Sequence, residues 1–190
     1  MVKIVFAFIV GLYAGSFLIY RTKEPDNLSS AIFDLERLLP STFHQLPRNV
    51  VRTLRSRGCA IPQTDLEPRP NNIITGEFAK RGQKDWAVLC SRGGNSSILV
   101  FWGDGIKAPS ELAKAPDKAY WLGNNEEGFH YYRHLMRADR KYILAHYREY
   151  GRGEFIPSIN HDGIDDGFLE KGSEVYYLYR RKWLSLPGAD

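Results

Sequence analysis

An uninterrupted apolar run near the amino terminus is the feature that most constrains how and where this chain folds. Residues 4–20 contain no charged residue and no proline, Lys3 precedes them, and Arg21 and Lys23 follow. The run has 17 residues, which places it between the apolar region of a signal peptide and the shortest helix that spans a bilayer. We therefore expect residues 1–23 to be a signal peptide or a signal-anchor segment that takes the protein out of the cytoplasm.

The sequence leaves cleavage of this segment open. Ala14 and Ser16 are small residues that suit a cleavage site, but apolar residues continue through residue 20 and favour an uncleaved anchor. The expected location is outside the cytoplasm, with the protein periplasmic, membrane-anchored through residues 4–20, or secreted. By length, residues 24–190 are expected to form a single globular domain.

The chain has two cysteines, Cys59 and Cys90, and both follow the apolar run. Export would deliver them to an oxidising compartment, so we predict a disulfide bond between them. On the chain-entropy model, closing this loop stabilises the fold by about 3.7 kcal/mol. The alternative is a pair of buried free thiols. The spacing matches no zinc or redox motif, so no metal site is expected here.

Periodicity of the apolar residues predicts an α+β domain. Helices are expected over residues 26–39, 47–58 and 139–151. Strands are expected over residues 73–78, 86–91, 98–102, 120–122 and 129–134, with a hairpin over 174–186. Prolines mark residues 61–72 and 109–116 as connections. The predicted fold is an antiparallel sheet of about five to seven strands with two N-terminal helices and one later helix, preceded by the N-terminal hydrophobic segment.

One short stretch resembles a known repeat family. Residues 76–89, GEFAKRGQKDWAVL, are similar to one unit of an FG-GAP or VCBS-type repeat, whose loop carries calcium ligands. Here Ala79 and Arg81 occupy ligand positions and only Asp85 remains, so the resemblance implies no calcium site. Taken whole, the chain resembles exported bacterial proteins of unknown function. That resemblance implies a compartment and no activity.

The best candidate for a ligand site is the stretch from Asn160 to Gly167. It gathers one imidazole and three carboxylates, from His161, Asp162, Asp165 and Asp166. Such a group could hold a cation or a polar ligand. Aspartate and glycine are also common turn residues, and Ile164 interrupts a calcium-loop pattern. We therefore expect a structural turn whose acids cap the backbone ahead of Phe168, with no bound metal.

A second candidate is an aromatic strand face. Tyr176 and Tyr177 lie next to Arg180 and Arg181, and a strand with this pattern buries one face and leaves the other free. The free face could stack on sugar rings or contact a protein partner.

Charge and motifs limit the possible functions. The chain carries 26 basic and 22 acidic residues, for a net charge of +4, which is too small for nucleic-acid binding unless it is concentrated on one face. No nucleotide fingerprint, nucleophile motif or cofactor site is present, so neither a catalytic residue nor a cofactor is predicted. We expect a non-enzymatic envelope protein, a binding or structural module whose partner is an envelope protein or a polysaccharide. The alternative is an extracytoplasmic hydrolase of cell-wall or other polymers that uses carboxylates near Asp162–Asp166.

Overall fold

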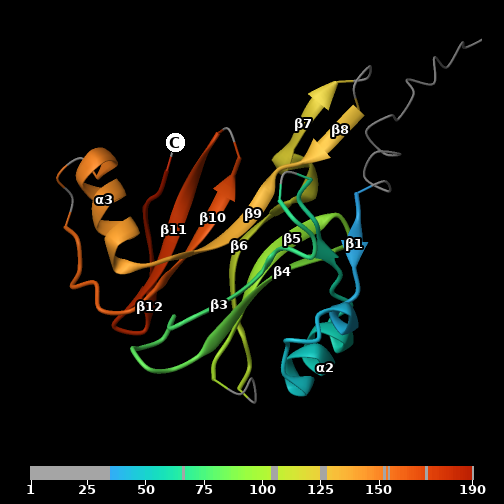
Figure 1. Ribbon diagram of the computed structural model, residues 1–190, viewed down its shortest axis with the longest axis horizontal. Coiled ribbons are helices and arrows are strands. Elements are labelled where there is room, and N and C mark those ends of the chain that lie inside the picture. Colours follow the sequence, from blue (N-terminus) through green and yellow to red (C-terminus); the bar gives the residue numbers. More distant parts are fainter. Residues whose placement is uncertain are drawn as a thin grey trace, which may run out of the picture.

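The structure is a computed structural model that describes residues 35–65, 67–103, 107–124, 128–151, 153, 155–169 and 171–189. The expected signal segment therefore lies outside the described residues. Within the described ranges, no helix combines the length and the apolar character needed to cross a membrane. These residues form twelve strands and two α-helices, and the fold is mostly β (Figure 1).

The first sheet has the strand order β3-β4-β5-β6, and all neighbours are antiparallel. Its strands are β3 (Ile73–Gly76), β4 (Asp85–Arg92), β5 (Asn95–Phe101) and β6 (Ser110–Pro116). On β4, Ala87 and Leu89 face one side while Val88 and Cys90 face the other, because side chains alternate along a strand. All four are buried, so this sheet is covered on both faces.

The second sheet has the order β12-β11-β10-β9 and is also antiparallel. Its strands are β9 (Arg133–Ala138), β10 (Gly163–Phe168), β11 (Gly172–Tyr179) and β12 (Lys182–Pro187). Helix α3 (Arg140–Tyr150) lies in the connection between β9 and β10. Arg180 and Arg181, both with positive φ, form the tight turn between β11 and β12, which confirms the predicted hairpin.

The two sheets pack face to face between two helices. Figure 1 shows α2 (Arg48–Ser56) against the first sheet and α3 against the second, so the layers run α2, first sheet, second sheet, α3. Each boundary is an apolar core. Representative pairs are Leu54 with Val88 under α2, Leu89 with Ile164 between the sheets, and Ile143 with Val175 under α3.

Short elements complete the fold. Strands β1 (Arg37–Leu38) and β2 (Ile61–Pro62) pair with each other, and β7 (Trp121–Asn124) and β8 (Gly128–Tyr131) form a hairpin. Two 3₁₀ turns, η1 (Pro40–Thr42) and η2 (Asp117–Tyr120), precede α2 and β7.

The predicted Cys59–Cys90 disulfide is confirmed, with a Cα–Cα distance of 5.1 Å. It joins the segment after α2 to β4. Beside it, the backbones of Ala60 and Ser91 exchange two hydrogen bonds, with N···O distances of 3.1 and 2.8 Å. The disulfide therefore fixes α2 to the outer face of the first sheet.

The predicted α+β class, with one sheet of five to seven strands and two N-terminal helices, is wrong. The described chain is mostly β, with four antiparallel sheets. The helix expected over residues 26–39 is described only from residue 35, and there Arg37–Leu38 pair with β2 as a strand. Its apolar spacing serves packing instead, since Leu35 and Leu38 contact two different cores.

A connection was also predicted where strand β6 lies. Prolines at both ends suggested an interruption, but the free edge of β5 supplies partners for a ladder, and the pairing tolerates a bulge. Ala113 takes a positive φ of 49° at this irregularity. The available strand edge therefore outweighed the local sequence preference.

Candidate functional site

The stretch predicted as a turn is a central strand. Residues 163–168 form β10, which pairs with β9 on one side and β11 on the other. Alternation turns Asp165 toward α3 and Asp166 toward the first sheet, and both side chains are buried. Gly167 lies against the ring of His134 on β9. The expected turn is wrong: the chain is extended here, and the two buried acids have partners on β9 and on α3.

Asp166 forms a buried ion pair with Arg133 of β9. The guanidinium donates from Nε and Nη2 to the two carboxylate oxygens, each at 2.8 Å, and Arg133 is fully buried. It also donates to Ser96 Oγ at 2.8 Å and to the carbonyl of Ala113 at 2.7 Å, so it links the two sheets. The ring of Tyr120 lies 4.3 Å from the guanidinium carbon.

The two partners of this pair have raised pKa values for different reasons. Burial alone would lower the pKa of Arg133, but the hydrogen bonds and charge of Asp166 outweigh it and raise that pKa. Burial raises the pKa of Asp166 above its ordinary value, against the lowering effect of Arg133. Because the guanidinium stays charged at any accessible pH, Asp166 is the member that titrates. Its role is structural.

Asp165 anchors α3 to the second sheet. Tyr142 of α3 donates its hydroxyl to Asp165 Oδ2 at 2.6 Å, and Asp165 is 1% exposed. Burial, followed by this hydrogen bond, raises the pKa of Tyr142 to about 12. Asp165 therefore serves helix docking, and it has no exposed surface with which to contact a ligand.

Of the two predicted tyrosines, Tyr177 is buried and Tyr176 is partly buried against the core between the sheets. Tyr177 is 1% exposed, donates to the carbonyl of Ser158 at 3.1 Å and accepts from the amide of Asn160 at 3.1 Å. Tyr176 packs in the core between the sheets and donates to Glu174 at 2.7 Å. Tyr177 thus holds the segment that leads into β10.

The remaining two predicted residues, His161 and Asp162, line a groove. The His161 ring stacks on Tyr177 with centroids 4.3 Å apart and planes at 8°. Both of its ring nitrogens lie 2.9 Å from backbone carbonyl oxygens, those of Asp162 and Leu178. Asp162 accepts a hydrogen bond from the amide of Glu77 at 3.0 Å. The structure therefore brings together two of the six predicted ligand-binding residues.

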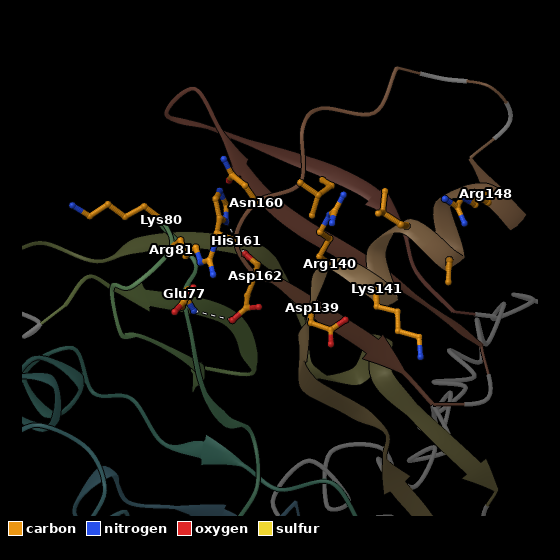
Figure 2. A pocket seen from close by; sticks show the side chains of 13 residues that line it. Glu77, Lys80, Arg81, Asp139, Arg140, Lys141, Arg148, Asn160, His161 and Asp162 are labelled. Carbon is orange, nitrogen blue, oxygen red and sulfur yellow. Dashed lines mark hydrogen bonds between the residues drawn. The ribbon is translucent and has the colours of Figure 1, made fainter.

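This groove is a wide hollow in the described part of the chain. It has a volume of about 1320 Å³ and opens to solvent. Figure 2 shows its three walls: the loop after β3, the face of α3, and the segment before β10. Leu144, Ala145 and Ile159 supply an apolar part of the lining.

Basic side chains dominate the rim. Five of them line the groove: Lys80, Arg81, Arg140, Lys141 and Arg148. All five are exposed, and none has a hydrogen-bond or ion-pair partner among the described residues. Arg140 and Lys141 occupy the first turn of α3, where the helix dipole disfavours a cation by about 0.3–1 kcal/mol each. Helix stability therefore does not explain these two residues.

A smaller hollow continues the groove past Arg137 and Lys84. It has a volume of about 570 Å³ and shares Glu77, Arg81 and Asp162 with the larger one. Together the two hollows carry seven basic side chains and three carboxylates, an excess of four positive charges. The formal net charge of the whole chain is also +4. The two hollows are therefore a positively charged region, as is helix α2, which carries Arg48, Arg52 and Arg55 and no acidic residue.

The loop that resembles an FG-GAP or VCBS unit lies beside the groove, but its carboxylate is committed to the protein. Asp85 is fully buried and accepts from the amides of Ala79 and Gly103, both at 2.8 Å, and from Gln83 Nε2 at 2.7 Å. Over the described ranges, no group of three or more His, Cys, Asp or Glu side chains is placed to hold a metal ion.

The basic residues of α3 were not predicted as site residues. One local signal could have found Arg140 and Lys141, because two cations directly after the cap Asp139 run against helix preference. Comparisons of the chain with protein-family models, with curated proteins and with solved structures gave no match. The geometry of the groove therefore carries the functional argument.

Proposed function

We propose that this chain is an exported, non-enzymatic binding module whose groove binds an anionic ligand. The observation that carries the proposal is the set of five exposed, unpartnered cations around one hollow. Such a set raises the local concentration of anions and gives each anionic group a charged hydrogen-bond donor. The disulfide and residues 4–20 support a location outside the cytoplasm.

The hydrolase alternative has less support from this geometry. Its proposed carboxylates do not converge, because Asp165 and Asp166 are buried on opposite faces of β10 and already have partners. Asp162 does line the groove, but its oxygen accepts from the Glu77 amide. A pair of acids free to act on a glycosidic bond is what hydrolysis needs.

Binding is tested with dextran sulfate and neutral dextran of equal length, which differ only in charge. The full chain is kept in a mild non-ionic detergent, and affinity is measured by isothermal titration calorimetry at two salt concentrations. We expect binding of dextran sulfate only, weakening as salt rises because screening reduces charge attraction. Equal binding of both polymers, or of neither, would overturn the proposal.

A matched pair of variants locates the site. The groove variant Arg140→Ala/Lys141→Ala/Arg148→Ala removes three positive charges, and Arg48→Ala/Arg52→Ala/Arg55→Ala removes three from α2. We expect the groove variant to bind dextran sulfate at least about tenfold more weakly, and the α2 variant to stay within about twofold. Equal losses would show that net charge alone, rather than the groove, drives binding.

Export has its own test. A reporter that is active only outside the cytoplasm is fused after Asp190, with and without residues 4–20. We expect activity only when the segment is present. A reporter that stays cytoplasmic with the segment intact would contradict export.

A further inference from the structure

From the shape and the mixed lining of the groove, we infer that its ligand is a linear acidic glycan, a chain of hydroxyl-bearing sugars with spaced carboxylates. This inference rests on the proposed function, because it names the class of anion that the groove takes. Three features of the groove carry it: length, the placement of carboxylates, and the absence of stacking rings.

The groove is longer than a single small anion. Arg140 and Arg148 lie eight residues apart on α3, which corresponds to about 12 Å along the helix axis. Lys80 and Arg81 lie on the wall opposite α3 (Figure 2). The smaller hollow shares Arg81 and extends the path beyond it. One phosphate or one carboxylate is too small to span both walls and the length of α3 between Arg140 and Arg148. A ligand that uses all of these cations must be extended and carry several anionic groups.

Carboxylates lie among the cations. Glu77, Asp139 and Asp162 line the same hollow, and Asp162 remains partly exposed. A densely charged polymer such as polyphosphate would place phosphates against these acids, at a cost in repulsion. A glycan places hydroxyl donors there instead, and carboxylates accept such hydrogen bonds. Acids interspersed with cations therefore match a ligand whose charges are spaced and whose remaining groups are hydroxyls.

The rest of the lining argues against single-stranded nucleic acid and offers aliphatic and amide groups to a sugar. Among the described residues that line the two hollows, none is Trp, Tyr or Phe, so the stacking platform typical of single-strand binding is missing from the lining. The His161 ring already stacks on Tyr177. Leu144 and Ile159 offer aliphatic surface for the C–H groups of a sugar, and the exposed amide of Asn160 can both donate and accept.

The test uses a fluorescein-labelled oligogalacturonate, read by fluorescence anisotropy with the full chain in mild detergent. Unlabelled competitors are galacturonate monomer, the methyl-esterified oligomer, polyphosphate of equal charge, and single-stranded oligothymidylate. We expect the oligogalacturonate to bind at least about tenfold more tightly than the monomer, because neighbouring groups reach separate cations. It should also bind more tightly than the ester, the polyphosphate and the oligothymidylate.

One variant reports on the role of the acids. Asp162→Asn keeps an oxygen for the Glu77 amide and removes a negative charge from the groove. We expect it to improve polyphosphate binding by about three- to tenfold relative to oligogalacturonate, as reduced repulsion predicts. An unchanged ratio would contradict the assigned role of this carboxylate.

The outcomes separate the two levels of the inference. If the monomer, the polyphosphate or the oligothymidylate binds as tightly as the oligogalacturonate, the glycan assignment is overturned while anion binding stands. If no anionic probe binds, the proposed function itself fails. Tight, length-dependent binding of oligogalacturonate that Arg140→Ala/Lys141→Ala/Arg148→Ala abolishes would support both.

Discussion

The two four-stranded sheets have the same antiparallel order, but their strands bury different chemistry. In the first sheet, the central strands β4 and β5 place mainly apolar side chains on both faces, and a disulfide fixes α2 to one of them. In the second sheet, strands β9 and β10 bury Arg133, Asp165 and Asp166. The groove lies beside the second sheet, where α3 and the segment before β10 supply two of its walls.

The apolar and the charged interiors constrain their neighbouring elements in different ways. Apolar burial is nondirectional and tolerates movement, whereas a buried ion pair demands defined geometry. Arg133 holds β10 in place and Asp165 holds α3 in place. Most residues of the groove belong to α3 or to the segment just before β10. The charged interior of the second sheet therefore positions the basic side chains of α3 that line the groove.

Removing Arg133 should have the largest effect on stability. Arg133→Ala leaves Asp166 buried without its partner, and we expect a loss of about 3–5 kcal/mol in the free energy of unfolding. Urea unfolding followed by tryptophan fluorescence measures it. Replacing both partners, Arg133→Met with Asp166→Leu, should recover most of the loss. A double variant as unstable as the single one would show that packing, not the unpaired charge, sets the cost.

Removing the disulfide tests how much it contributes to the stability of the first sheet and α2. Cys59→Ser/Cys90→Ser should lower the free energy of unfolding by about 3–4 kcal/mol, since the unfolded chain regains the freedom of a 31-residue loop. Hydrogen exchange should accelerate first in α2 and residues 59–62, before β10 and β11 respond. Two reactive thiols in the denatured, unreduced wild-type protein would refute the bond.

Tyr142→Phe should have a smaller effect and should remove a pH dependence. The variant leaves Asp165 without its donor, and we expect a loss of about 2 kcal/mol at neutral pH. The folded pKa of Tyr142 is raised from 10.0 to about 12, so its stabilisation is complete below pH 10 and disappears as the pH rises through 12. The difference between wild type and variant should therefore shrink over this range in chemical unfolding. A constant difference would contradict the assignment.

Asp162→Ala should have the smallest effect. It removes one hydrogen bond to the Glu77 amide, at a cost of about 1 kcal/mol, and Asp162→Asn should keep most of that stability. Thermal unfolding measures both variants, with and without calcium or zinc. A metal-dependent rise in the melting temperature that Asp162→Asn abolishes would instead assign this carboxylate to a metal site.

The sequence predicts regular elements where local preference and packing agree. Strands over 86–91 and 98–102 are rich in apolar and β-branched residues and were found as β4 and β5. Helix α3 follows its predicted cap, since Asp139 accepts from the amide of Tyr142. Strand β10 could not be predicted, because Asp165, Asp166 and Gly167 disfavour strands and are held by partners distant in sequence.

The groove was hidden from the sequence for a similar reason. Its walls come from residues 77–81, 139–148 and 159–162, which share no local pattern and meet only because two sheets stack. The modest net charge gave no hint that seven basic side chains lie around these two hollows. His161 and Asp162 were predicted as site residues because clustered acids and imidazoles are typical of ligand sites. The basic residues were not predicted, because exposed arginines are common on protein surfaces.

The glycines of β10 have a consequence for how the strand finds its alignment. Charge alone does not exclude every slip of one residue, because in one direction Asp165 would take the place of Asp166 beside Arg133. Space prevents it. A Cβ atom at position 167 would lie 2.0 Å from Cε1 of His134, and a slip in either direction brings Asp166 or Phe168 to that position. Gly167 thus selects the strand register sterically, because only glycine, which has no side chain, fits under the imidazole of His134.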